Sequence, residues 1–462
     1  MRSPLIKLAG ATLLILVLMT SADANELTLD DCIEQALKNR SSIVAARGAE
    51  TVAKADQRWA LGQFLPRVNA SYSYSKTKTT DIEPDQVITY VADSMIQQTV
   101  IGTDTAHDLR YIPGFETVKS ADQDRTSKTF DVRASMDLFN LANFFNYAGA
   151  RADRAKAHLD VIRSEQDLIY SVKLAYYAYL ASAENVTVQE GAVKRSQEQL
   201  KLIQSKYDLG SASLSDVLKQ KVQSGNDRLS LLTAQNGVVS SRATLAYTVG
   251  LDPLGDIEFS STYNVRQYDG GLNDAVGFGL SHEPGLLAAQ KRVDAAKHGL
   301  RSRKAEYLPK LVGFGSLSWS DATRGDTLIY DFSSRDRTFG LQVSWNIFDG
   351  FARERSVAMG KVNQNNARAS MADIRNLLVS SIKTAYMEID QYKEAKTVAS
   401  ENVEAAEEDL KITQEKYNLG AATILDLLDA QVSLKQAQVS LIRAGFDMNL
   451  AVAKLENAMG KM

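Results

Sequence analysis

The sequence is poor in the residues that build disulfide scaffolds and metal centres. Its 462 residues include a single cysteine, Cys32, which cannot form an internal disulfide and is best interpreted as a small buried apolar residue. The four histidines lie far apart and show no metal-ligand spacing. Lysine and arginine number 53 against 56 acidic residues, a balance that gives no indication of nucleic-acid binding. No set of nucleophile and base is recognisable, so we predict neither a cofactor nor an enzymatic activity.

The sequence also has no apolar run long enough for a transmembrane helix. The apolar run at the N-terminus, Leu13–Met19, follows Arg2 and Lys7 and precedes Ala22-Asp23-Ala24. A basic start, a short apolar run and a small-residue cleavage site are typical of a secretory signal peptide. We therefore expect residues 1–24 to be a signal peptide of an exported protein that carries no acylated N-terminal cysteine.

Proline is scarce, and its distribution predicts long helices. None of the seven prolines lies in residues 142–208 or 351–417, and a continuous helix of about 65 residues would span roughly 100 Å. Both segments run into a glycine, Gly210 or Gly420, as helices often do at their C-terminal end. Ser213 then stands three residues before Asp216, and Thr423 stands three residues before Asp426. Because this spacing is that of a helix-opening capping box, each stretch predicts a helix, a tight turn and a second helix.

The two predicted hairpins belong to an internal duplication. Val172–Tyr176 matches Ile382–Tyr386, and Met136–Asn140 matches Trp345–Asp349 in order and spacing. A repeated order of parts indicates one domain built from two similar halves rather than several domains. We divide the chain into a first repeat (25–250) with a hairpin tip near 210, a linker or equatorial region (251–282), and a second repeat (283–462) with a tip near 420.

Each half begins with a helix, the first over residues 27–63, and contains two stretches in which polar and apolar residues alternate. This period of two predicts strands at about 66–76, 129–139, 309–320 and 338–348, with residues 77–128 as a long polar loop. A soluble sandwich and a membrane barrel with a wet interior both produce such strands. Four strands are fewer than the roughly eight of the smallest membrane barrels, so several chains would have to share one barrel.

The helix after the second tip has an apolar seam with alternating three- and four-residue spacing, typical of a coiled coil. The equivalent positions of the first repeat follow this apolar spacing less regularly. The seam residues are Leu427, Ala430, Leu434, Ala437, Leu441, Ala444, Met448, Ala451, Leu455 and Ala458.

The whole mature chain resembles the TolC family of outer-membrane channel proteins. The resemblance rests on the paired tips, Tyr207-Asp208-Leu209-Gly210 and Tyr417-Asn418-Leu419-Gly420, on the strand pairs and on the duplication. It implies an α+β membrane protein: a homotrimer with four strands per chain in a shared twelve-stranded β-barrel, surrounded by outer-membrane lipid and continuous with a long α-helical coiled-coil tunnel in the periplasm. It also implies two protein partners, a periplasmic adaptor (membrane fusion protein) and an inner-membrane pump, and no nucleic acid.

The resemblance also assigns roles to residues of the tips. Asp426 and Asp429 match positions where family members narrow the closed periplasmic end of the tunnel. Asp426 is also explained as the capping residue of its helix, and Asp429 as a residue on a solvated helix face. Tyr417 and Asp216 match positions whose contacts hold the inner helices shut, and we place Ser215 and Lys219 with them. Leu209, Gly210, Leu419 and Gly420 form the adaptor-facing tips.

One position departs from the family. Ala422 stands where members often carry an arginine that links the helix to the next protomer. Lys219 and Asp429 occupy equivalent positions of the two repeats with opposite charge, and a pair between them, within or between protomers, would partly replace that link.

These observations predict a gated outer-membrane exit duct of a tripartite efflux pump or type I secretion system. An alternative from another functional class, that of structural and adhesive proteins, is a secreted trimeric coiled-coil adhesin or structural stalk whose strands form a soluble head.

Overall fold

The computed structural model describes residues 26–79, 86–92, 111–117, 123–255, 257–261, 268–324 and 327–462. These residues form eight helices and six strands and divide into two compact units. One unit comprises Asp56–Ala150 and Lys297–Val362, and the other comprises Met1–Ala55, Arg151–Ala296 and Asn363–Met462. None of the helices in the described ranges combines the length and apolar composition needed to cross a membrane.

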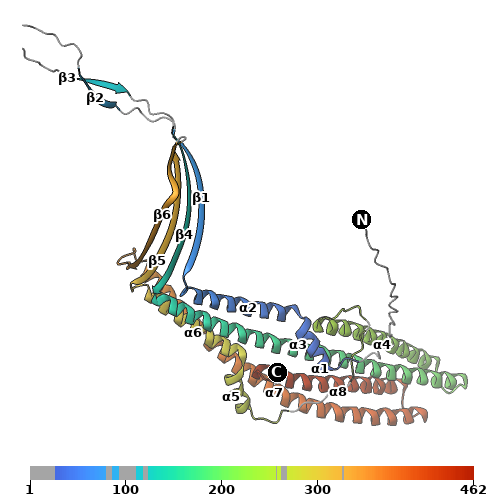
Figure 1. Cartoon of the computed structure of the whole chain (residues 1–462). Helices are drawn as coiled ribbons and strands as arrows, with labels where there is room; N and C mark the ends of the chain where they lie inside the picture. Colours follow the sequence, from blue (N-terminus) through green and yellow to red (C-terminus); the bar gives the residue numbers. More distant parts are fainter. Residues whose placement is uncertain are drawn as a thin grey trace, which may run out of the picture. The chain divides into compact units, whose positions relative to one another are not determined.

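The unit of Asp56–Ala150 and Lys297–Val362 is built on a four-stranded antiparallel sheet (Figure 1). Its strands, in the order β1-β4-β5-β6, are β1 (Arg67–Thr79), β4 (Gln123–Phe139), β5 (Lys310–Arg324) and β6 (Thr327–Ser344). Tyr72 lies opposite Phe130, and Phe130 lies opposite Trp319 with ring centroids 5.4 Å apart. Alternate side chains such as Val68, Tyr72 and Leu341 are exposed, so one face of the sheet is an uncovered apolar surface.

The strands are longer than the alternation predicts, and the segment predicted as a loop also contains regular structure. β1 continues to Thr79, β4 already begins at Gln123, and β2 (Gln86–Ala92) pairs antiparallel with β3 (Tyr111–Thr117) between them. Polar residues such as Thr, Ser and Lys dominate the extended ends of β1 and β4. Register with a neighbouring strand, rather than hydrophobic patterning, therefore sets how far these strands run.

The other unit is helical, and its first element differs from the single helix predicted for 27–63. The chain forms α1 (Leu29–Asn39) and α2 (Ser41–Gly62), separated by Arg40, whose backbone is extended. The region predicted as a linker contains α5 (Leu272–His282), which is followed directly by α6 (Pro284–Ala305). Glycine and proline therefore shorten the helices here without removing them.

The predicted duplication is confirmed by two equivalent cores. Val172, Ala175 and Tyr176 are buried in a cluster with Cys32, and the Tyr176 hydroxyl donates a hydrogen bond to the Ser260 carbonyl (2.7 Å). The matching residues of the second repeat, Ile382, Ala385 and Tyr386, belong to a second cluster. Both cores therefore use the same face of the long helix in each half.

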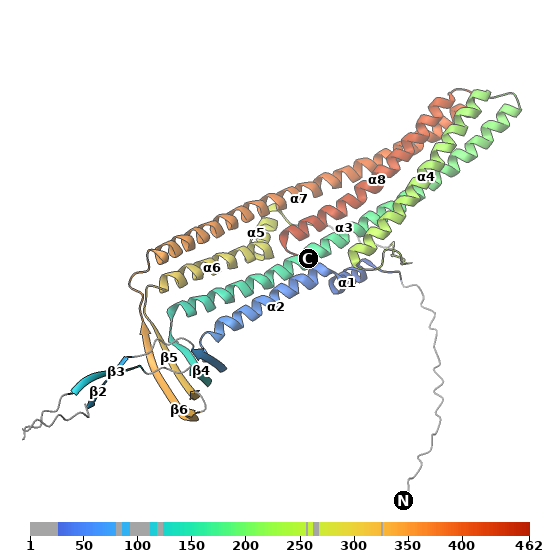
Figure 2. The ribbon, with the colours of Figure 1, turned by 90° about the horizontal axis from the view of Figure 1, so that it is seen from above.

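The longest elements are α3 (Leu141–Asp208) and α7 (Ala352–Asn418), which return as α4 (Leu214–Val249) and α8 (Ile424–Met459). The two hairpin tips lie side by side at the same end of the helical unit (Figure 2). Seven residues of the predicted α8 seam are buried and the other three are half-buried, which confirms the seam. The α8 seam therefore supplies much of the core that holds this hairpin in place.

Candidate functional site

The two hairpin tips turn through the same backbone geometry. Gly210 has φ 76° and Gly420 has φ 75°, the left-handed conformation that favours glycine. In the first tip the Ser211 N–H donates to the Lys206 carbonyl, and in the second the Ala421 N–H donates to the Lys416 carbonyl (both 2.8 Å). The turns leave Leu209 and Leu419 pointing out, 84% and 85% exposed.

Asp216 and Asp426 both close a capping box, as their spacing predicts. The Thr423 N–H and hydroxyl each donate to Asp426 Oδ2 at 2.8 Å, and the Asp426 N–H donates to Thr423 Oγ1 at 3.3 Å. Ser213 and Asp216 form the corresponding reciprocal pair at the start of α4. The hydrogen bond from the Thr423 backbone, followed by that from its side chain, lowers the pKa of Asp426, so its carboxylate stays charged.

Contacts around Tyr417 fasten the two tips together. Tyr417 packs against a small buried cluster made of Ile203 and Val217 from the first hairpin and Ile424 and Leu427 from the second. The Lys206 ammonium lies 4.9 Å from the centre of the Tyr417 ring and donates to Asn418 Oδ1 at 3.0 Å. Burial, and then the nearby Asp216 carboxylate, raise the pKa of Tyr417, so its hydroxyl stays protonated.

The predicted constriction residues lie on an exposed face of α8. Asp426 and Asp429 are three residues apart and therefore share that face. Neither has an ion-pair partner within the described part of the chain, and Lys219 on α4 has none either. The predicted pair between Lys219 and Asp429 is consequently not formed within the described chain.

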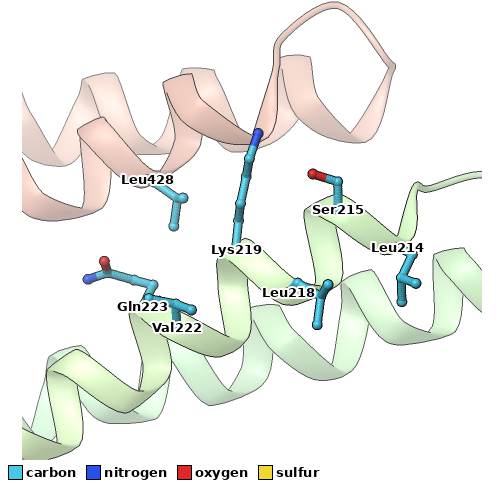
Figure 3. Close-up of a pocket in the computed structure, with 7 residues that line it drawn as sticks. All are labelled: Leu214, Ser215, Leu218, Lys219, Val222, Gln223 and Leu428. Carbon is cyan, nitrogen blue, oxygen red and sulfur yellow. The ribbon is translucent and has the colours of Figure 1, made fainter.

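Ser215 and Lys219 line a groove of about 580 Å³ beside the tips (Figure 3). Its floor is formed by the exposed apolar side chains Leu214, Leu218 and Val222 of α4, and Leu428 of α8 borders it. Lys219 extends from α4 on the side where Leu428 lies (Figure 3). The groove is thus an apolar surface with one cation at its rim, next to the exposed tip leucines.

Sequence reasoning missed a buried polar contact between the hairpins. Lys435 on α8 donates to Asp227 on α4 at 2.9 Å, with side chains only 20% and 5% exposed, and the Gln223 amide donates to both Asp227 oxygens. Closer to the tips, the Gln414 amide on α7 donates to Gln199 on α3 at 2.7 Å. The sequence did carry a signal, because Asp227 occupies the seam position that Ala437 fills in the second repeat.

Comparisons with known proteins agree with this arrangement. The family model described as outer membrane efflux protein matches residues 32–251 and 279–461. BepC of Brucella suis, an outer membrane efflux protein, is 21% identical over 98% of this chain and 90% of its own length. TolC of Escherichia coli, an outer membrane protein, is 22% identical over 77% of this chain and 73% of its own.

Among solved structures, the outer membrane protein VceC of Vibrio cholerae shares the fold. It superposes with a TM-score of 0.76 at 19% identity and covers 94% of this chain and 96% of its own. Because the family model covers most of both repeats, the chain belongs to the outer membrane efflux protein family, which includes TolC, and is a protein of the outer membrane.

Proposed function

We propose that this protein is the outer-membrane exit duct of a tripartite efflux pump or a type I secretion system. The family is one of channels and transporters, which favours a duct over the adhesin or stalk alternative. The observation that carries the proposal is one chain that combines an open four-stranded sheet, apolar on an exposed face, with two long helical hairpins whose tips meet.

Three copies of the chain would complete the barrel. The sheet ends at β1 and β6, so its edge strands lack partners among the described strands. An unpaired edge cannot face lipid, because every backbone group in a membrane needs a hydrogen-bond partner. Three four-stranded sheets joined edge to edge would supply twelve strands, with aromatic and aliphatic side chains facing the lipid.

The hairpin tips would act as the gate on the periplasmic side. Asp426 and Asp429 are exposed and charged on the first turns of α8, and three copies would bring six carboxylates around one axis. Such a ring attracts cations and narrows the opening. Tyr417, which packs against the cluster shared by both hairpins, and the nearby Asp216 would have to separate when the duct opens, while Ser215 and Lys219 border the groove beside them.

The exposed tips and the groove would meet the periplasmic adaptor, which links the duct to an inner-membrane pump. Leu209 and Leu419, next to Gly210 and Gly420, have most of their side-chain surface uncovered, and the apolar groove beside the tips extends this surface. An adaptor that covers them would bury apolar surface at the end of the hairpins that must move when the duct opens.

Single-channel conductance in planar bilayers tests the proposal. The purified protein should form long-lived channels that hexamminecobalt(III) blocks from the side of the helices. Asp426→Asn combined with Asp429→Asn should raise the resting conductance and weaken the block, whereas Glu198→Gln, an exposed carboxylate on α3, should change neither. Absence of any conductance would favour the adhesin, and an unchanged block in the double variant would remove the aspartates from the gate.

A further inference from the structure

The exposed apolar face of the four-stranded sheet changes to a cationic one along its length. Residues opposite one another across an antiparallel ladder lie on the same face of the sheet. Phe130 on β4 lies opposite Tyr72 on β1 and Trp319 on β5. Trp319 in turn lies opposite Arg335 on β6, so an arginine stands on the face that otherwise carries aromatic and aliphatic side chains. Arg337, two residues further along β6, shares this face.

The same change occurs on the other strands. Lys76 stands two residues beyond Tyr74 on β1, and Lys128 stands two residues beyond Phe130 on β4, counted away from the helices. On β5 the equivalent position is Asp321, which is buried and forms a loose ion pair with Lys128 at 3.9 Å. The cations of this face, which we call the cationic row, are Lys76, Lys128, Arg335 and Arg337.

Among the described strand residues, the opposite end of this face carries no such row. All four strands join helices at that end: β1 follows α2, β4 precedes α3, β5 follows α6 and β6 precedes α7 (Figure 1). Arg67 and Lys310, the first residues of β1 and β5, belong to the polar face, because each lies opposite a serine of that face. A general preference of cations for membrane surfaces would populate both ends, so a row at one end points to one leaflet.

The cationic row runs obliquely across the ladder, parallel to the offset of the strands. On β1 the first cation is Lys76, beyond the level of Trp319, whereas on β6 it is Arg337, short of that level. At the helix end β1 starts opposite Ser135 while β4 continues to Phe139, an offset in the same direction. Strands of a membrane barrel are tilted by about 35–45°, which produces such an offset along any plane parallel to the membrane. The row therefore follows one level of the proposed barrel.

Two arginines of the row border a shallow pocket of about 260 Å³. Arg335 and Arg337 line it together with the apolar side chains of Leu317 and Trp319. Asp336 also borders the pocket but stands between the arginines on the other face of β6. Both arginines are exposed, and neither has an ion-pair partner in the part of the chain that the structure describes. Alternate residues of a strand are about 7 Å apart, so both guanidinium groups can reach one headgroup.

We propose that the cationic row binds the phosphate groups of a phosphorylated glycolipid in the outer leaflet of the membrane. Arg335 and Arg337 would hold the phosphates, because the guanidinium fork matches phosphate oxygens bidentately. Lys128 would contribute a further charge from β4. The acyl chains would lie along the apolar side chains of Leu317 and Phe339, on the part of the same face nearer the helices.

Charge and position both favour this class of lipid. A phosphate monoester carries about −1.5 to −2 charges at neutral pH, which suits two guanidinium groups better than the single charge of a phospholipid diester. The row lies at the end of the sheet away from the helices, which in the proposed duct are periplasmic, so it would meet the outer leaflet. The inference rests on the proposed duct and adds the lipid that surrounds it and the residues that bind this lipid.

Binding of fluorescently labelled diphosphoryl lipid A to the detergent-solubilised protein tests the site. Arg335→Gln with Arg337→Gln should weaken binding by about tenfold or more, because charge-assisted contacts to both phosphates are lost. Arg67→Gln with Lys310→Gln, which removes two cations of the polar face, should leave the affinity unchanged. Asp321→Asn should strengthen binding, since it removes a negative charge and releases Lys128. Equal affinities in the two double variants would overturn the site.

Competition distinguishes the sources of phosphate. Unlabelled lipid A should displace the probe, whereas equal concentrations of inorganic phosphate or of phosphatidylglycerol should displace little of it. Displacement by inorganic phosphate would show a site for the free anion, and equal displacement by phosphatidylglycerol would show a site for anionic lipid of any kind. Either result would overturn the assignment to a phosphorylated glycolipid.

Photo-cross-linking in intact cells tests the location. Phe339→p-benzoylphenylalanine, next to Arg337 in the register of the exposed face, should give adducts that antibodies against lipopolysaccharide recognise. Trp345→p-benzoylphenylalanine, exposed at the helix end of the sheet, should give none. The adduct at 339 should fade when Arg335→Gln and Arg337→Gln are added. Equal adducts at both positions, or an adduct that ignores the arginines, would refute the site.

Conductance and membrane fractionation separate this site from the proposed function. The variant with Arg335→Gln and Arg337→Gln should still conduct in phosphatidylcholine bilayers, which shows that it folds; the competition series and the adducts of the parent decide the question without it. A parent that conducts, yet neither binds lipid A nor forms the adduct, refutes the site and leaves the duct intact. A parent that is absent from the outer membrane and does not conduct refutes the duct and, with it, the site.

Discussion

Removing the Lys435 ammonium should destabilise the contact between the hairpins more than removing the Asp227 carboxylate. Lys435→Met would leave Asp227, whose side chain is 5% exposed, with only the Gln223 amide as a partner. Leaving one charge of a buried ion pair without its partner costs about 3–5 kcal/mol. Asp227→Asn would cost less, about 1–3 kcal/mol, because the Lys435 ammonium is 20% exposed and can turn toward water.

The measurement is the unfolding temperature of the purified protein in detergent, followed by the loss of helical circular dichroism. Lys38→Met is the matched control, because Lys38 pairs with Glu34 on an exposed helix face, where such pairs contribute about 0–1 kcal/mol. The double variant Asp227→Leu with Lys435→Met should fall close to the parent or above it, since replacing both charges removes their desolvation cost.

Two results would refute this reasoning. One is a Lys435→Met protein that unfolds at the temperature of the Lys38→Met control, which would show that water already surrounds the pair. The other is a double variant that is less stable than either single variant, which would show that shape rather than charge holds the hairpins together at this level.

Three further predictions concern the tips. Tyr417→Ala should raise resting conductance, because it removes the ring that packs against the cluster shared by the two hairpins. Because the pKa of Tyr417 is raised above 10.0, the stability that its neutral hydroxyl contributes should be present below pH 10 and lost as the pH rises through the raised pKa, in the parent but not in Tyr417→Phe, as thermal unfolding at pH 9–11 would show. Thr423→Ala should lower the free energy of unfolding by about 0.5–2 kcal/mol, because it removes the side-chain cap of α8. Thr423→Ser keeps a capping hydroxyl and should retain most of that stability in the same thermal-unfolding assay. Because the pKa of Asp426 lies below 3.8, its capping contribution to stability is present above that pH and lost as the pH falls through its lowered pKa. Asp426 should therefore still be charged at pH 4.5, and Asp429→Asn channels should keep a cation block at that pH. A block that vanished there would contradict a gating role for Asp426.

The elements that depend on local chemistry were predicted from the sequence. Gly210 and Gly420 with the capping pairs Ser213–Asp216 and Thr423–Asp426 define both tips, because left-handed backbone and helix caps are properties of a few adjacent residues. The α8 seam and the four main strands follow from a sustained period of 3.5 or 2. The position of α5, the break at Arg40 and the hairpin of β2 and β3 did not follow, because no sustained period marks them.

Only the tertiary structure decided which side chains meet across the repeats. Lys206 reaches Tyr417, and Lys435 reaches Asp227, although each pair is more than 200 residues apart in sequence. In the sequence, Asp227 is recognisable only as a polar exception to an otherwise apolar seam. The packing of α4 against α8 shows that this residue forms a buried ion pair.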